Sequence, residues 1–188
     1  MRFDIKSIGE QFDIFGEFID ARPCGNGHIN DTFAATYDQG GTVIRYIHQR
    51  INHHVFRDPV AQMENIQRVT THIRRKLKIR DGSHTTRHAL TLVPSLQGLP
   101  YYRDEEGNYW RTYVLIEGAT SGDMAETPRH AYEAAKAVGR FQRLLADLEG
   151  ERLHETIPDF HNTPKRLARL KTAVREDACQ RASTAGPE

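Results

Sequence analysis

Residues 42–77, TVIRYIHQRINHHVFRDPVAQMENIQRVTTHIRRKL, contain the change in hydrophobic period that decides the fold. Positions 42–51 are rich in valine, isoleucine and tyrosine, which favour β-structure. Farther on, Asp58 is a good N-cap, Pro59 suits the first position of a helix, and apolar residues then recur every three or four positions up to Leu77. The stretch therefore predicts a strand followed by an amphipathic helix of about five turns.

Turn signals on both sides of this stretch separate further segments with strand character. Gly25-Asn26-Gly27 and the segment 38–41 are typical of tight turns. Because such turns join the first three strands, these strands are expected to form an antiparallel meander, with the helix at 59–81 inserted after the third. The predicted strands lie at 12–21, 29–37, 42–51, 89–94 and 109–116.

The last third of the chain is predicted to be helical. Thr127 followed by Pro128 is a typical helix start, and an apolar stripe continues from there until Gly150. Thr163-Pro164 opens a third helix in the same way.

A polar, glycine-containing segment at 117–122 separates the strand-rich part from the helical part and is the predicted boundary. The fold class is therefore α+β. We expect a five-stranded antiparallel lobe at 1–117, a linker at 118–126 and helices within 127–188. This order is the plan of a protein kinase-like N-terminal lobe followed by the first helices of a helical lobe.

Composition excludes several classes of protein. The 188 residues include 26 basic and 25 acidic side chains, and the net charge of +1 gives no overall signature of nucleic-acid or membrane binding. No apolar run approaches the ~18 residues of a membrane helix, and the charged N-terminus does not resemble a signal peptide. Cys24 and Cys179 are too far apart for a CxxC site or a disulfide framework. We therefore expect a soluble cytoplasmic protein.

The turn at 25–27 is the first candidate for binding chemistry. Gly25 and Gly27 would let the backbone approach a polyphosphate, and the N–H groups of such a turn can point at phosphate oxygens. Asn30 and Thr32 add short polar groups suited to phosphate or to metal-bound water. Two glycines are equally compatible with an ordinary β-turn, and the sequence leaves both interpretations open.

The strand at 42–51 and the helix behind it are the second candidate. A kinase N-lobe presents a cation from its third strand to the phosphates, and a carboxylate on the next helix holds that cation. Glu64 is the available carboxylate, but the strand contains no lysine. Arg45 or Arg50 would have to supply the charge, with Gln49 as a neutral hydrogen-bond donor. Arg50 and Glu64 are equally compatible with solvated surface charges.

Histidines and basic residues offer weaker candidates. His53-His54 and the segment 84–88 lack the carboxylate or cysteine partners of a metal site, so no metal site is predicted. The basic stripe from Arg74 to Arg80 lies at a helix C-terminus, where the helix dipole favours cations. A non-catalytic module that binds nucleic acid through this stripe is the alternative function.

In combination these segments resemble the aminoglycoside phosphotransferase superfamily, which includes choline kinase-like enzymes. Within it the chain is most similar to N-acetylhexosamine kinase-like sugar phosphotransferases. The resemblance extends from about Phe12 to Arg181 and rests on motifs that follow one another in the family's order. These motifs are 25–33, 46–52, 55–59, 63–66, 109–111, 139–142, 157–163 and 166–167.

The resemblance implies an ATP- and Mg²⁺-dependent kinase that phosphorylates a hydroxyl of a small molecule, such as an amino sugar of the N-acetylhexosamine type. It implies that the turn after residue 24 covers the ATP phosphates, that the third strand faces them, and that the backbone at 117–119 contacts the adenine. The residues it implies for nucleotide binding are Gly25, Asn26, Gly27, Asn30, Thr32, Gln49, Arg50, Glu64 and Glu117.

One part of the family pattern is absent. Kinases of this kind use an Asp in a catalytic loop of His-x-Asp type, an Asn shortly after it and a later Asp for magnesium. The sequence contains no His-x-Asp. We therefore expect the N-terminal part of an enzyme, truncated and inactive alone. Its helices after residue 127 are expected to expose an apolar face, with self-association as the consequence.

Overall fold

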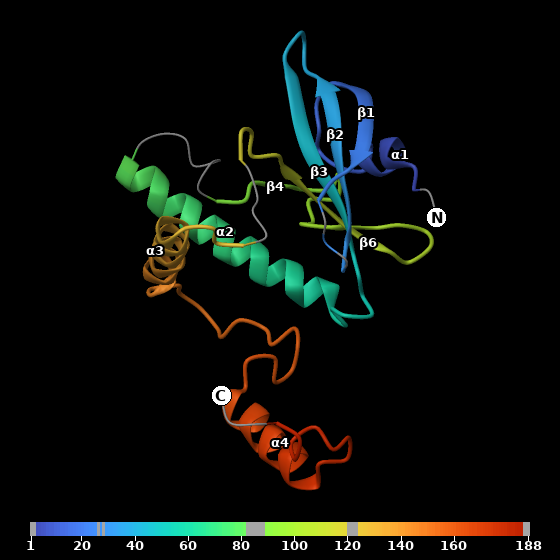
Figure 1. The fold of residues 1–188 in the computed structure, drawn as a ribbon. Coiled ribbons are helices and arrows are strands. Elements are labelled where there is room, and N and C mark those ends of the chain that lie inside the picture. The colour runs from blue at the N-terminus through green and yellow to red at the C-terminus, as the bar shows by residue number, and fades with distance from the viewer. Residues whose placement is uncertain (1–2, 26, 28, 82–88, 120–123, 186–188) are drawn as a thin grey trace. The chain divides into compact units, whose positions relative to one another are not determined.

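The computed structural model describes residues 3–25, 27, 29–81, 89–119 and 124–185, with the backbone alone at 78–81 (Figure 1). The chain divides into two compact units, Met1–Thr156 and Ile157–Glu188. The helices of the first unit are α1 (Ile5–Gly9), α2 (Pro59–Asp81) and α3 (Pro128–Leu145), and the second unit contains α4 (Thr163–Glu176).

One antiparallel sheet of six strands organises the first unit. Its main path runs in the order β1-β2-β3-β6-β4, and β5 pairs with β6 beside that path. The predicted α+β fold, with α2 inserted after the third strand, is confirmed. The strands are β1 (Glu17–Pro23), β2 (Asp31–Asp38), β3 (Val43–Ile51), β4 (Leu92–Val93), β5 (Tyr102–Arg103) and β6 (Tyr109–Val114).

The N-terminal segment differs from the prediction. The strand expected at 12–21 begins later, at Glu17, because Phe12 is used elsewhere and forms an isolated bridge with Ser95. The short helix α1 was not predicted; Asp4 caps it by accepting a hydrogen bond from the backbone N–H of Ser7 at 3.2 Å. β5, a sixth strand, was not predicted from the sequence either.

The predicted helix after β3 is confirmed. The Asp58 carboxylate accepts a hydrogen bond from the backbone N–H of Ala61 at 3.0 Å, as expected of an N-cap. Met63, Ile73 and Leu77 of its apolar stripe are buried. α2 therefore contributes one face to the core, as its period indicates.

The two faces of the sheet differ in chemistry. Trp110 and Tyr37 point into the main hydrophobic core, which α1 helps to cover, and we call this side the core face. His48 is also fully buried there: its Nε2 lies 3.1 Å from the Tyr37 hydroxyl and its Nδ1 2.8 Å from Thr112 Oγ1. Burial lowers the pKa of His48 to about 4, so its ring is neutral at pH 7.

The predicted helix starts near the C-terminus are also confirmed. Thr127 accepts a hydrogen bond from the backbone N–H of His130 at 3.2 Å and caps α3, which ends at Leu145, earlier than predicted. Figure 1 shows α3 beside α2, and the two helices are in contact. Large apolar side chains nevertheless remain exposed on α3, Val138 and Phe141 among them, as the sequence predicts. Among the described residues, none of the helices has the length and apolar character of a membrane span.

Candidate nucleotide-binding face

A row of three polar side chains crosses three neighbouring strands. Gln49 on β3 donates from Nε2 to Thr32 Oγ1 on β2 at 2.7 Å. Arg111 on β6 donates to Gln49 Oε1 from Nε at 2.9 Å and from Nη2 at 2.5 Å. Residues paired across antiparallel strands share a face, and Gln49 is paired with both partners. We call these three residues the polar row.

The polar row lies on the side opposite the core face. Neighbours along a strand point to opposite faces, and Trp110, next to Arg111, points into the core. Arg111 Nη1 lies 4.0 Å from the sulfur of Met63 on α2, so α2 borders this side of the sheet. We call this side, which carries Thr32, Gln49 and Arg111, the α2 face.

Arg111 has an unusual environment for an arginine. Its side chain is partly buried, and burial lowers the pKa of its guanidinium. Its only described side-chain oxygen acceptor is the neutral amide of Gln49, and no described carboxylate forms an ion pair with it. The sequence pattern does not single out Arg111 as a site residue, because Trp110 beside it marks that strand as core.

Arg50, by contrast, lies on the core face. Its Nε donates to Asp31 Oδ2 at 2.7 Å, and its Nη1 donates to Asn108 Oδ1 at 3.2 Å. Its guanidinium lies 5.1 Å from the centre of the Phe3 ring. Because Arg50 and Gln49 are adjacent on one strand, the structure places them on opposite sides of the sheet.

Glu64 contacts a different part of the unit. Its carboxylate lies 2.7 Å from His154 Nε2. The neighbouring Asn65 donates to the backbone oxygen of His154 at 2.8 Å and accepts from its N–H at 2.9 Å. The structure thus brings Glu64 together with the segment after α3, and neither Gln49 nor Arg50 is among its described partners.

The glycine turn joins β1 to β2 beside the polar row. Gly25 has a φ of +83°, which favours glycine, and an added Cβ at Gly25 or Gly27 would meet nothing within 4 Å. Asn26 lies outside the described residues. At the end of the turn, Asn30 Oδ1 accepts from the backbone N–H of Asn52 at 2.9 Å. The turn is therefore anchored at that end, and there is open space beside both glycines.

The segment after β6 is tied to β3. Arg45 Nε donates to Glu117 Oε1 at 2.8 Å, and Arg45 Nη2 contacts the second carboxylate oxygen. These hydrogen bonds lower the pKa of Glu117. The backbone N–H of Leu115 donates to the oxygen of Arg45 at 2.9 Å. The residues just before the predicted linker are thus held against β3, while residues 120–123 of that linker lie outside the described residues.

Tyr113 connects this segment to the polar row. It is two positions from Arg111 on β6 and therefore shares its face. Burial raises the pKa of Tyr113, the charge of Arg111 opposes that rise, and the Cys24 thiolate, where it forms, adds to it. Cys24 precedes the glycine turn, and its N–H donates to the oxygen of Thr32 at 2.9 Å. The turn, the polar row and the end of β6 are therefore neighbours.

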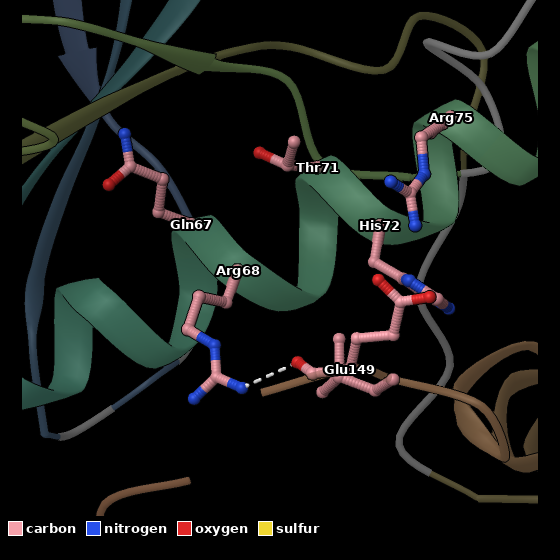
Figure 2. Close-up of a pocket in the computed structure, with 7 residues that line it drawn as sticks. Gln67, Arg68, Thr71, His72, Arg75 and Glu149 are labelled. Atoms are coloured by element: carbon pink, nitrogen blue, oxygen red, sulfur yellow. Dashed lines mark hydrogen bonds between the residues drawn. The ribbon is translucent and has the colours of Figure 1, made fainter. Parts of the chain in front are cut away.

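A concave surface lies apart from the polar row, between α2 and the segment after α3 (Figure 2). It is an open groove of about 460 Å³. Figure 2 shows Arg68 extending from α2 toward Glu149, where its Nη2 donates to the backbone oxygen at 3.0 Å. Lys76 Nζ donates to the oxygen of Leu144 at 3.0 Å and pairs with Asp147. Lys76 thus holds the C-terminal end of α3, where a helix dipole favours positive charge, and Arg68 holds the segment that follows it.

The basic stripe of the alternative function overlaps this contact. Lys76, one of its members, is the cation that holds the end of α3. Arg74 and Arg75 are described, whereas the side chains from Lys78 to Arg80 are not. The stripe is therefore in part a structural feature of the α2–α3 contact.

The histidine candidates do not form a metal centre in the described part of the chain. The rings of His53 and His54 lie 4.6 Å apart, centre to centre, and the segment 84–88 is outside the described residues. Among the residues that the structure describes, no group of three or more His, Cys, Asp or Glu side chains could hold a metal ion.

A sequence model described as the phosphotransferase enzyme family matches residues 20–187. The match begins within β1 and includes the polar row, the glycine turn and the segment that follows β6.

Proposed function

Because the chain belongs to the phosphotransferase enzyme family, we propose that it forms the nucleotide-binding part of an ATP-dependent small-molecule kinase. The observation that carries this proposal is the polar row on the α2 face. It places a hydroxyl, an amide and a guanidinium side by side on three strands, next to a glycine turn. Phosphate oxygens accept hydrogen bonds from all three kinds of group.

In this proposal the triphosphate of ATP lies along the polar row. The turn with Gly25, Asn26 and Gly27 covers it, and backbone N–H groups of the turn donate to phosphate oxygens. Asn30 holds the end of the turn in place through its hydrogen bond to Asn52. The polar row would then supply side-chain donors to the phosphates from the α2 face of the sheet.

The adenine is proposed to contact the backbone at 117–119. The pair between Arg45 and Glu117 fixes the start of this segment against β3, so its N–H and C=O groups are held in one orientation. The proposed organisation keeps 1–117 as the nucleotide-binding lobe, 118–126 as the hinge and 127–188 as the start of the helical lobe.

Arg50 and Glu64 are assigned a supporting part. Arg50 pairs with Asp31 at the first residue of β2, directly beside Thr32 of the polar row. Glu64 pairs with His154 and thereby fixes α2, which borders the α2 face through Met63. Both residues would influence nucleotide binding through the position of the strand and helix that they hold.

The reaction proposed for the whole enzyme transfers the γ-phosphoryl group of ATP to a hydroxyl of an amino sugar of the N-acetylhexosamine type. Catalysis of this transfer consists largely of positioning and charge neutralisation, and Mg²⁺ supplies part of the charge when it is bound with ATP. The described residues offer no cluster that fits a metal ion, and the sequence has no His-x-Asp loop. We therefore propose that the 188-residue chain binds nucleotide and does not by itself transfer phosphate.

Thermal unfolding of the chain with and without ATP tests this proposal. ATP at 100 times its Kd would stabilise the folded chain by about 2.7 kcal/mol. For a chain of this size, that corresponds to a rise in Tm of roughly 5–10 °C. A Tm that does not change at any ATP concentration would contradict the proposal.

A matched pair of variants locates the effect. Thr32→Val removes the hydroxyl of the polar row and should reduce the rise in Tm that ATP produces. Thr42→Val removes a hydroxyl from an exposed threonine at the turn before β3 and should leave that rise unchanged.

A further inference from the structure

We propose that Arg111 is the residue that binds the phosphates of the nucleotide with a positive charge. This inference rests on the function proposed above and makes it specific. It assigns to β6 the phosphate-binding charge that a kinase-like lobe is expected to present from its third strand. It also predicts that recognition depends on the phosphates more than on the nucleoside.

Few cations of the sheet could supply this charge. There is no lysine between Lys6 and Lys76, so an arginine of the sheet must supply the charge. The other sheet arginines already have partners. Arg22 pairs with Asp20, Arg45 with Glu117 and Arg50 with Asp31, and the Arg103 guanidinium lies 5.5 Å from the centre of the Tyr109 ring.

Arg111 differs from these arginines in the charge of its partner. Its two described hydrogen bonds to oxygen both go to one neutral atom, Gln49 Oε1. A guanidinium has five N–H groups, and the third nitrogen, Nη1, is in contact only with the Met63 sulfur at 4.0 Å among the described contacts. Donors remain that the described side chains do not use.

The partly buried charge of Arg111 is energetically unfavourable without an anionic partner. A charge that is partly removed from water is stabilised when it is paired, and an unpaired one is costly. The lowered pKa of Arg111 has burial as its largest cause, which agrees with that expectation. An anion bound on the α2 face would supply the missing charge, and a phosphate accepts two parallel hydrogen bonds from one guanidinium.

Arg111 also lies near the glycine turn. Arg111 lies in the polar row with Gln49 and Thr32, and Thr32 bonds to the residue that precedes the glycine turn. Gln49 holds the guanidinium through two nitrogens and thereby fixes its plane. A polyphosphate on the α2 face would therefore meet a guanidinium whose orientation is already set.

The test measures the affinity of the full chain for ATP, adenosine and inorganic tripolyphosphate by calorimetry. In Arg111→Met the affinity for ATP and for tripolyphosphate should fall at least about tenfold, while that for adenosine changes less than about twofold. Arg111→Lys keeps the charge but loses the two-nitrogen contact, so its affinity for ATP should lie between that of the original chain and that of Arg111→Met. Arg103→Gln, with the same loss of charge outside the polar row, should bind all three ligands like the original chain.

The outcomes separate this inference from the proposed function. If the original chain binds neither ATP nor adenosine, the proposed function is wrong and the assignment of Arg111 is wrong with it. If the original chain binds ATP and Arg111→Met binds it equally well, only the assignment of Arg111 is overturned. Equal losses for ATP and adenosine would also overturn it. If Arg111→Met does not fold, Arg111→Lys provides the test. Unchanged affinities of Arg111→Lys for ATP, adenosine and tripolyphosphate would contradict a contact that requires the guanidinium.

Discussion

Gln49 Oε1 accepts two hydrogen bonds from Arg111, one from Nε at 2.9 Å and one from Nη2 at 2.5 Å. The acceptor is neutral and the donor is charged. The pair therefore joins β3 to β6 without cancelling the charge of the arginine, and this leaves the charge available to a ligand.

Gln49→Glu should separate stability from binding. A carboxylate at this position would neutralise Arg111 and strengthen the contact by about 1 kcal/mol, since hydrogen bonds to charged groups exceed neutral ones by that order. The Tm without ligand should rise by about 2–4 °C. The affinity for ATP should fall, because the added charge repels phosphate. Thermal unfolding and calorimetry check both effects, and a variant that is more stable and also binds ATP more tightly would contradict this account.

Buried His48 should make stability dependent on pH. Its pKa is lowered to about 4 in the folded chain, against about 6.5 in an unfolded one. Between these two pKa values the unfolded chain binds more protons than the folded one. The contribution of the neutral His48 to stability is therefore fully present above about pH 6.5 and is lost as the pH falls toward 4. The loss amounts to roughly 3 kcal/mol by the linkage relation.

Urea unfolding between pH 4 and pH 7 measures this loss. His48→Gln can retain hydrogen bonds to Tyr37 and Thr112 but cannot titrate, so its stability should change less over this range. His130→Gln, at an exposed position, should keep the original pH dependence. A His48→Gln variant with the same pH dependence as the original chain would show that another group causes it.

Gly9 permits the close packing around His48. A Cβ added there would lie 2.0 Å from the hydroxyl oxygen of Tyr37, which is in contact with His48. Gly9→Ala should therefore destabilise the chain by about 1–3 kcal/mol, although alanine favours a helix. Gly139→Ala in α3, where a Cβ meets nothing within 4 Å, should instead stabilise the chain by about 0.5–1 kcal/mol. Unfolding in urea checks the opposite signs, and two changes of the same sign would contradict this packing.

The two cysteines offer a chemical probe of the proposed site. Cys24 lies directly before the glycine turn, and Cys179 is exposed in the second unit. If ATP lies beneath the turn, it should slow the alkylation of Cys24 by N-ethylmaleimide at least about threefold at saturation. The rate at Cys179 should not change. Mass spectrometry of the digested chain gives both rates, and equal slowing at the two cysteines would indicate a general effect of ATP rather than a bound nucleotide.

Local sequence signals predicted much of this fold. The cap at Asp58, the cap at Thr127 and the β-branched residues of β3 each act within a few positions, so the sequence alone identifies α2, α3 and β3. α1 has a local cap at Asp4, but its five residues are too few to show a helical period, and the late start of β1 depends on how the N-terminal segment packs on the sheet. Such contacts join residues far apart in the chain and leave no local signal.

The candidate site could be predicted only in part. The sequence named Gln49 and Arg50 without choosing between them, and alternation along β3 separates them once His48 is known to point into the core. Arg111 could not be identified, because its place beside Gln49 depends on the pairing of β3 with β6. The two strands lie before and after α2 in the sequence, and the register of their pairing cannot be deduced from either strand alone.

Amide hydrogen exchange of the 188-residue chain, with and without saturating ATP, tests most directly whether a nucleotide binds on the α2 face. The account predicts added protection in peptides that contain the glycine turn at 24–33, the middle of β3 around Gln49 and the end of β6 through 119. It predicts no change in the groove between α2 and residues 144–151. Protection confined to that groove, or no protection anywhere in the chain, would contradict the account.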